Sequence, residues 1–234
     1  LFSACTPQIN YHGNLPNKDL IKGRKVILVD DHAVVRAGYK ILLSNIENIS
    51  VVAETNTGED AIRLSKEHNP DVIVMDLSLP GVSGIEAIRR IVKDNNDIKI
   101  LVFTMHEEVI FVERALQAGA IGYMTKSTDP EMLSEAISQV AQGKKYLDDE
   151  LKQKMTYEHE KSRDSDALLS DLSAREFQIF CLLAEGLNTN EISKQLNISY
   201  KTAANYSTQI KSKLNASTVA DIARIAIRSN IIKA

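Results

Sequence analysis

Short apolar runs alternate with amphipathic segments between residue 25 and about residue 143. The runs are rich in Val and Ile and are apolar along most of their length, which is typical of strands buried on both faces of a parallel sheet. Five strands are expected, at Lys25–Asp30, Ser50–Ala53, Asp71–Asp76, Ile98–Phe103 and Ile121–Met124. The alternation with helices predicts an α/β domain of (βα)5 topology over residues 24–143.

The helical period is plainest after Pro130, where Leu133, Ala136, Ile137 and Val140 share one face and Gly143 ends the pattern. Residues 144–170 then change in character. We predict a short helix over Lys152–Glu160, followed by the polar, charge-mixed run Lys161–Asp166 without apolar periodicity. These features indicate a linker over residues 144–170, and residues 1–23 are expected to be an N-terminal extension.

Beyond the linker no strand pattern appears, and side chains that can cap helices mark the helix starts. Ser173 with Glu176 and Asn188 with Glu191 have the spacing of capping boxes. Ser199 and Ser217 are further N-cap candidates. We therefore predict four short helices and a small all-α domain over residues 171–234.

Composition and charge narrow the class of protein. The chain is 44% hydrophobic and 25% charged, as in ordinary folded proteins. No apolar run reaches the roughly 18 residues that a membrane helix needs, so we expect no membrane association and a cytoplasmic location. Cys5 and Cys181 lie far apart without metal-ligand spacing, which predicts neither a disulfide framework nor a zinc site.

Charge is unevenly distributed along the chain. Residues 169–234 carry 8 Lys and Arg against 5 Asp and Glu, a net charge of +3, which leaves −6 for the rest of a chain whose total is −3. An acidic N-terminal domain suits a cation, and a basic C-terminal domain suits phosphate groups.

Polar side chains stand where the predicted strands end. Asp30 and Asp31 end the first strand, Asp76 the third and Thr104 the fourth, and Lys126 follows the fifth. The carboxyl ends of parallel strands meet at one edge of a sheet, so these groups should converge there. Three carboxylates in one small volume repel one another, and a hard divalent cation such as Mg²⁺ would relieve that repulsion.

Each of these residues also has a plain structural interpretation when taken alone. An isolated Asp31 would cap the following helix, while Lys126 and Thr104 would be ordinary strand-end residues. Their common position at strand ends, in this order, favours the functional interpretation.

With the stretch DVIVMDLSLPGVSG around Asp76 and with Tyr123, this set resembles the receiver domain of response regulators, a flavodoxin-like fold. The resemblance implies that Asp76 accepts a phosphoryl group from a sensor histidine kinase. It implies that Thr104 and Lys126 bind that group and that Tyr123 turns from exposed to buried as a switch. It also implies a Mg²⁺ site formed by Asp30, Asp31, Asp76 and the backbone carbonyl of Ser78.

Two positions near Thr104 are less typical of that family. Met105 is bulkier than the small residue often found there, which leaves the lifetime of the phosphoryl group open. His106 is interpreted as a solvated histidine at the start of a helix, and no role is assigned to it.

The segment LSAREFQIFCLLAEGLNTNEISKQLNISYKTAANYSTQIKSKLNAST resembles the LuxR-type helix-turn-helix output domain of NarL/FixJ response regulators. The resemblance implies that a helix over Tyr200–Leu214 enters the DNA major groove and that Thr189–Leu196 supports it. The polar side of this helix can present hydrogen-bonding groups to bases and phosphates. The predicted DNA-binding residues are Lys201, Asn205, Tyr206, Thr208, Gln209 and Lys211.

Some features of this domain leave alternatives open. The ring of Tyr206 fits the core, while its hydroxyl could reach a phosphate. The recognition helix has no Arg, so a monomer should bind DNA weakly, with a shallow salt dependence, and activation should require a homodimer. The last helix either meets a partner copy or packs within the chain through Val219, Ile222, Ala223 and Ala226.

The sequence thus predicts a bacterial transcription regulator controlled by phosphorylation, and not an enzyme. Its expected partners are a sensor histidine kinase, double-stranded DNA, a second copy of itself and RNA polymerase. Two alternatives differ in class. A Mg²⁺-dependent phosphohydrolase would also form an aspartyl phosphate, but Ser78 stands where its acid group is expected. A constitutive DNA-binding protein would keep the fold without phosphorylation.

Overall fold

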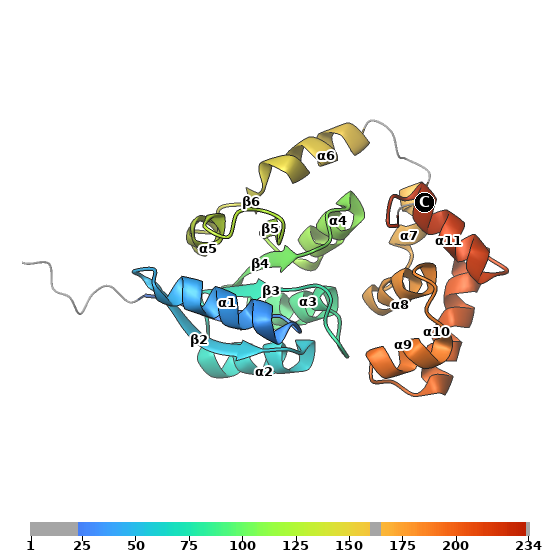
Figure 1. The fold of residues 1–234 in the computed structure, drawn as a ribbon, viewed down its shortest axis with the longest axis horizontal. Coiled ribbons are helices and arrows are strands. Elements are labelled where there is room, and N and C mark those ends of the chain that lie inside the picture. The colour runs from blue at the N-terminus through green and yellow to red at the C-terminus, as the bar shows by residue number, and fades with distance from the viewer. Residues whose placement is uncertain (1–22, 160–164, 233–234) are drawn as a thin grey trace, which may run out of the picture.

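A computed structural model describes residues 23–159 and 165–232 (Figure 1). The chain forms an α/β part, built around a sheet, and a helical part that lies at one end of it. Apart from Gly23, the predicted N-terminal extension lies outside the described residues. Within the two described ranges, no helix combines the length and apolar character that crossing a bilayer requires.

All strands of the described sheet are parallel, in the order β2-β1-β3-β4-β5-β6. The chain moves from β1 to β2 on one side and then returns to β3 on the other, so the ends of β1 and β3 flank the point where the winding reverses. Ligands bind at this point in open α/β sheets. The strands are β1 Arg24–Val29, β2 Ile49–Thr55, β3 Val72–Met75, β4 Lys99–Thr104, β5 Gly122–Thr125 and β6 Tyr146–Leu147.

Helices cover both faces of the sheet because alternate strand residues point to opposite faces. Ile27 and Val29 of β1 pack in the cluster that contains α2, α3 and α4, whereas Val26 and Leu28 pack in the cluster that contains α1 and α5. The (βα)5 prediction is confirmed. The helices are α1 Ala33–Ser44, α2 Gly58–His68, α3 Gly84–Asp94, α4 Val109–Ala118 and α5 Met132–Ala141.

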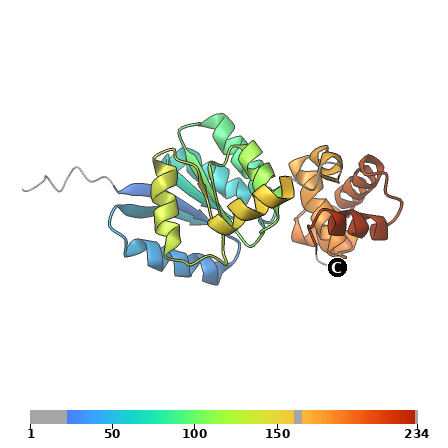
Figure 2. The same ribbon diagram turned by 90° about the horizontal axis from the view of Figure 1, so that it is seen from above.

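A sixth strand, β6, extends the sheet within the segment predicted as a linker. Its two residues pair with β5, and two residues carry no periodicity that a sequence pattern could show. Asp148 fixes the next turn, because its carboxylate accepts hydrogen bonds from the backbone N–H of Thr125 at 3.1 Å and of Leu151 at 3.0 Å. The helix α6, Asp149–His159, starts there and extends toward the helical part (Figure 2).

Residues 171–232 contain the four predicted helices, and a fifth helix, α7, precedes them. The additional helix α7 lies at the end of the segment predicted as a linker, and it begins inside the polar run Lys161–Asp166. The two predicted capping boxes and the N-cap at Ser199 are confirmed. The prediction that Ser217 is an N-cap is wrong, because Thr218 caps the last helix and forms a third capping box with Asp221. The helices are α7 Ser165–Ser170, α8 Ala174–Ala184, α9 Thr189–Gln195, α10 Tyr200–Lys213 and α11 Val219–Arg228.

The two parts are packed against each other through α8, which lies against α3 (Figure 1) and contacts α4 through the rings of Phe177 and Phe111. Arg175 donates a hydrogen bond to the carbonyl of Gly81, and Gln178 donates to the carbonyl of Leu79 at 3.1 Å. Both acceptors lie in the loop between β3 and α3. The helical part therefore contacts the loop that follows β3.

Candidate functional site

The carboxylates predicted to converge do so at the carboxyl end of the sheet. Asp30 follows β1 and Asp76 follows β3, and they are 6% and 2% exposed. Ligand atoms of Asp30, Asp31, His32 and Asp76 all lie within 4.8 Å of one another. The oxygen-rich set fits a hard cation such as Mg²⁺, which prefers carboxylate, carbonyl and water oxygens.

Lys126 provides the positive charge that the apposed carboxylates require. Its Nζ atom lies 2.6 Å from Oδ2 of Asp76 and 2.7 Å from Oδ2 of Asp30. Burial disfavours the charged amine, but Asp76 and Asp30 outweigh this effect and raise the pKa of Lys126. At Asp31, burial and the nearby charges of Asp76 and Asp30 raise the pKa against the opposing effects of His32 and Lys126.

Ser78 and Thr104 are two further predicted members of the site. The backbone N–H of Ser78 donates to Oδ1 of Asp76 at 3.2 Å, which fixes the carboxylate. Thr104 ends β4 and is fully buried, and its hydroxyl has no hydrogen-bond partner within the described parts of the chain. An unpaired buried hydroxyl costs roughly 1–3 kcal/mol. Thr104 is thus a donor available to an incoming acceptor.

Tyr123 is fully buried and donates a hydrogen bond from its hydroxyl to the backbone carbonyl of His106 at 3.0 Å. Burial raises its pKa well above the usual value. The inward position, predicted to follow phosphorylation, is therefore already adopted by Tyr123 in this structure.

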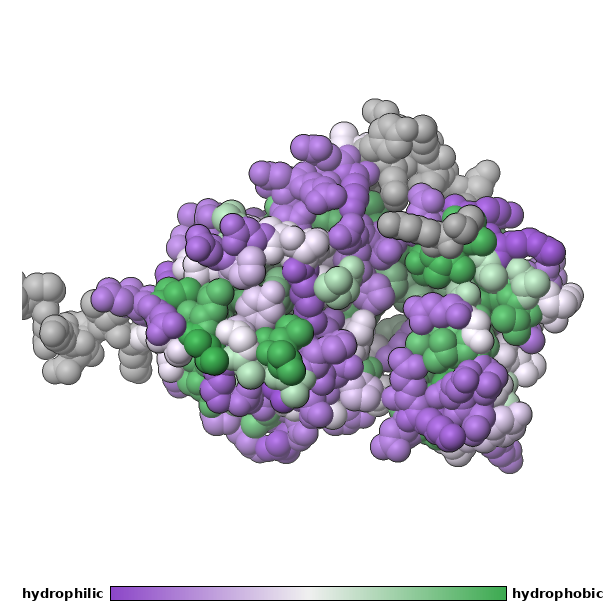
Figure 3. All heavy atoms as spheres, in the orientation of Figure 1, coloured by the Kyte–Doolittle hydropathy of each residue, from purple (hydrophilic) through white to green (hydrophobic). Residues whose placement is uncertain are grey.

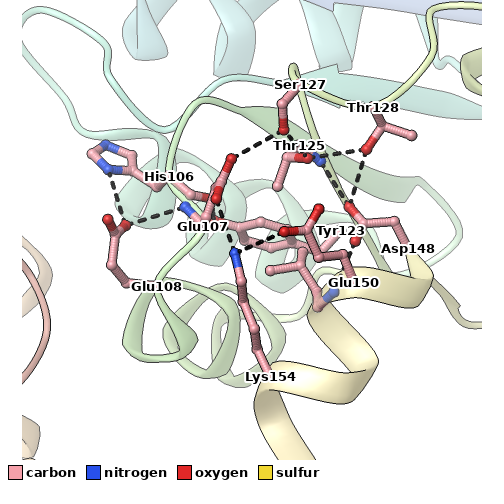
Figure 4. Close-up of polar contacts among 11 residues, drawn as sticks. His106, Glu107, Glu108, Tyr123, Thr125, Ser127, Thr128, Asp148, Glu150 and Lys154 are labelled. Atoms are coloured by element: carbon pink, nitrogen blue, oxygen red, sulfur yellow. Dashed lines mark hydrogen bonds and ion pairs between the residues drawn. The ribbon is translucent and has the colours of Figure 1, made fainter.

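The loop that follows Thr104 is connected to the linker helix (Figure 4). Glu107 accepts a hydrogen bond from Ser127 at 3.0 Å and pairs with Lys154 of α6 at 2.9 Å. Glu107 and Ser127 each lie close in sequence to a predicted phosphoryl-binding residue. The contacts link α6 to both loops at the edge of the acidic pocket.

A cavity of about 390 Å³ lies between the α/β part and the helical part. In Figure 3 the surface is hollowed between the two parts. Asp31, Ser78 and His106 line one wall of the cavity, and Phe177 and Cys181 of α8 line the other. The helical part thus stands at the open side of the acidic pocket.

The predicted DNA-binding residues lie together on α10, away from the acidic pocket. Ala203, Ile210 and Leu214 are buried in the core of the helical part. Tyr206 is half-buried and borders a second cavity between the two parts, of about 420 Å³. Lys211 is also half-buried, whereas the exposed members are Lys201, Asn205, Thr208 and Gln209.

The last helix, α11, has features of both alternatives that the sequence left open, namely packing within the chain and contact with a partner copy. Ile222 and Ala226 are fully buried in the core of the helical part, and Ala223 is half-buried. Val219 remains 42% exposed and Ile227 39% exposed, so part of the apolar face of α11 points to solvent.

The interpretation of His106 as a solvated residue is wrong. Its side chain is 28% exposed, its Nε2 atom lies 3.0 Å from the hydroxyl oxygen of Ser78, and its ring stacks on Phe111. Burial lowers the pKa of the imidazole. Neither partner is adjacent to His106 in the sequence, so no local signal identified it.

Comparisons with known proteins agree with the fold and with the site. Residues 26–138 match the response regulator receiver domain, and residues 170–226 match the bacterial regulatory proteins of the luxR family. The response regulator UvrY of Escherichia coli K12 is 38% identical over 209 residues, which cover 89% of this chain and 96% of UvrY. The response regulator GacA of Pseudomonas aeruginosa is 37% identical over 210 residues, 90% of this chain and 98% of GacA.

Among solved structures, RcsB of Salmonella enterica serovar Typhimurium is similar to this chain. That structure shows RcsB bound to promoter DNA in the presence of the phosphomimetic BeF3⁻. It is 25% identical, with a TM-score of 0.62, and the match covers 87% of this chain and 98% of RcsB.

A receiver domain followed by a helix-turn-helix domain defines a class of signalling proteins. The chain belongs to the two-component response regulators with a LuxR-type output domain, the NarL/FixJ type, and is homologous to UvrY and GacA. This family consists of transcription regulators rather than enzymes.

Proposed function

We propose that this protein is a transcription regulator controlled by phosphorylation, which accepts a phosphoryl group on Asp76 from a sensor histidine kinase. The observation that carries the proposal is the placement of Asp76 between the Nζ atom of Lys126 and the backbone N–H of Ser78. Phosphoryl transfer asks a protein mainly to position the reacting groups and to neutralise charge on the transferred oxygens.

Each residue of the pocket has a distinct role in this proposal. Asp76 supplies the attacking oxygen, and Lys126 stabilises the charge on the phosphoryl oxygens. The hydroxyl of Thr104, buried and without a partner in the described chain, donates to one of those oxygens once they are present. Tyr123 is already in the inward position, where its hydroxyl donates to the backbone carbonyl of His106.

The carboxylates of Asp30, Asp31 and Asp76, with the backbone carbonyl of Ser78, would hold Mg²⁺. When bound, the ion supplies further positive charge to the phosphoryl oxygens. The clustered ligand atoms support this assignment. His32, whose Nδ1 atom lies 2.7 Å from Asp31, keeps one of these carboxylates in place.

The exposed polar face of α10 would bind the DNA major groove, and a homodimer would read paired half-sites. The RcsB–promoter complex supports DNA binding by this class of output domain. The DNA-contacting residues proposed are Lys201, Asn205, Tyr206, Thr208, Gln209 and Lys211. We further propose that the receiver domain spans residues 24–143, the linker residues 144–170 and the output domain residues 171–234. RNA polymerase is a further proposed partner, and the proposed location is the cytoplasm.

The test treats the purified protein with acetyl phosphate and Mg²⁺ and follows intact mass, sedimentation and DNA binding in the same samples. Asp76→Asn should lose the phosphoryl adduct that the wild type acquires. Asp71→Asn is the matched control, because Asp71 is exposed and precedes the same strand at its opposite end. Its adduct should be unchanged.

An adduct confined to Asp76, together with dimer formation and tighter DNA binding, would support the complete proposal. Absence of the adduct in the wild type would leave a constitutive DNA-binding protein as the better description. An adduct that changes neither assembly nor DNA affinity would remove the link between phosphorylation and transcription.

A further inference from the structure

An unbroken series of ring contacts leads from the acidic pocket into the helical part. The imidazole of His106 stacks on Phe111 of α4, with ring centroids 3.9 Å apart and planes 10° apart. Phe111 meets Phe177 of α8 edge to face at 5.1 Å. The series continues within the helical part, because Phe177 stacks on Phe180 at 6.2 Å.

The first ring of this series is anchored at the pocket itself. The Nε2 atom of His106 lies 3.0 Å from the side-chain oxygen of Ser78, the residue two positions after Asp76. The backbone carbonyl of His106 accepts the hydrogen bond of the Tyr123 hydroxyl. Both the backbone and the side chain of His106 are therefore held by residues of the candidate site. His106 also lies two residues after Thr104.

Phe177, the first ring of the series in the helical part, lies at the contact that holds the two parts together. Phe177 is 1% exposed, and the guanidinium of Arg114 from α4 lies 4.0 Å from its centroid. Arg114 also donates hydrogen bonds to the carbonyls of Leu169 and Leu172, at the start of the helical part. A movement of Phe111 would therefore act directly on the contact that docks α8.

We propose that His106 is the residue through which occupancy of the phosphoacceptor site controls docking of the output domain on the receiver. This inference rests on the proposed function. When a phosphoryl group draws the Thr104 hydroxyl toward it, the loop that carries His106 moves with Thr104. The imidazole then leaves Ser78 and the face of Phe111, Phe111 loses its position against Phe177, and the docked arrangement is weakened.

Such a change is a shift between two arrangements, and the series of rings makes the docked one sensitive to the pocket. A series of contacts alone does not establish coupling, which must be measured by removing its members. Docking is therefore the quantity that the test follows.

Cys181 supplies a native reporter of docking. It lines the cavity between the two parts and is 8% exposed, so its thiol should react slowly while the parts are docked. The reaction is followed in the full chain with Cys5→Ser, so that a single thiol reports. Small-angle X-ray scattering of the same samples gives the radius of gyration, which rises when the parts separate but not when one side chain alone changes.

Acetyl phosphate with Mg²⁺ should raise the labelling rate of Cys181 in the wild type by about tenfold or more, together with the radius of gyration. His106→Leu removes the ring and the bond to Ser78. It should speed labelling before phosphorylation and reduce the response to less than about twofold. His106→Phe keeps a ring for stacking but lacks the bond to Ser78, so it should stay docked at first and also respond weakly. His68→Leu, in the last turn of α2, should behave as the wild type.

Intact mass of each sample separates the possible failures. If the wild type acquires no adduct on Asp76, the proposed function and this inference both fail. If all variants acquire the adduct and His106→Leu responds as the wild type does, the inference alone is overturned. It is overturned equally if the phosphorylated wild type changes neither its labelling rate nor its radius of gyration.

Discussion

The Nζ atom of Lys126 lies 2.6 Å from Oδ2 of Asp76, and both side chains are almost completely buried. Removing the amine would leave carboxylates facing each other without a counter-charge, which costs about 3–5 kcal/mol when a buried ion pair loses one partner. We predict that Lys126→Met lowers the free energy of unfolding by about that amount. Mg²⁺ should restore part of the loss and should stabilise the variant more than the wild type.

Urea unfolding with and without MgCl2 measures this effect. Lys66→Met is the control, because Lys66 pairs with Asp94 on the surface, where an ion pair contributes about 0–1 kcal/mol. Equal stabilisation of both variants by Mg²⁺ would contradict the prediction.

Gly84 begins α3 directly beneath the loop that contains Asp76. A Cβ atom at this position would overlap the carbonyl oxygen of Asp76 and lie 2.7 Å from Cα of Leu77. Gly84→Ala should therefore cost about 1–3 kcal/mol, as overpacking of a tight site does. Because the displaced backbone carries the phosphoacceptor, the variant should also form less adduct with acetyl phosphate.

Gly38 in α1 provides the opposite control. Apart from its two chain neighbours and the backbone of its own helix, no atom lies within 4 Å of a Cβ added there. Since Gly disfavours a helix interior, Gly38→Ala should stabilise the protein by about 0.5–1 kcal/mol and leave adduct formation unchanged. Thermal unfolding and intact mass of both variants check the pair.

Arg114 is half-buried at the contact between the two parts, where burial lowers the pKa of its guanidinium to about 10. Its guanidinium donates to the carbonyls of Leu169 and Leu172. Hydrogen bonds to charged groups are worth about 1.5–3 kcal/mol, so Arg114→Met should weaken docking by roughly that amount. Hydrogen exchange should then become faster in α7 and α8, whereas the surface variant Arg63→Met should leave it unchanged.

Two lysines of α10 differ in whether their ammonium groups are available to contact DNA phosphates. Lys201 is exposed, whereas Nζ of Lys213 lies 2.7 Å from Glu176. Lys201→Met should reduce the slope of log K against log salt by about 1, as expected for one lost phosphate contact. Lys213→Met should change the slope less and destabilise the helical part more. Fluorescence anisotropy with duplex DNA over a salt series distinguishes the two.

Glu176 closes the capping box of α8 and accepts a hydrogen bond from Lys213. Burial alone would raise its pKa, but Lys213 and the backbone of Ser173 outweigh burial and lower the pKa below 4.5. A lowered carboxylate pKa stabilises the folded state above pH 4.5, and this contribution is lost as the pH falls through the folded value.

Glu176→Gln should accordingly lower the free energy of unfolding by about 1 kcal/mol at neutral pH. The difference from the wild type should shrink as the pH falls toward about pH 3. Urea unfolding across this range provides the measurement, and a difference that grows in acid would contradict the assignment.

The sequence was most informative where structure depends on local pattern. Strand-end carboxylates such as Asp30 and Asp76 could be placed together because parallel strands bring their carboxyl ends to one edge. The capping box of Ser173 and Glu176 was equally accessible, since its partners are three residues apart.

The features that could not be predicted depend on residues that are distant in the sequence. His106 meets Ser78 across 28 positions and Phe111 across a turn into α4, and neither contact leaves a pattern near His106. Phe177 has the period of an ordinary core residue of α8, although it also serves the contact between the two parts. Docking of this kind results from two folded surfaces and not from local propensity.

The cavity wall formed by α8 affects the rate at which Asp76 can be phosphorylated. A protein phosphodonor that approaches Asp76 from this side competes with the chain's own output domain for the same surface. If the docked form holds about 99% of the molecules, the apparent affinity of such a donor falls about 100-fold below its intrinsic value. A small donor that fits the cavity of about 390 Å³ would not be slowed in the same proportion. The ratio of the two phosphorylation rates is therefore a kinetic measure of how firmly the protein stays closed.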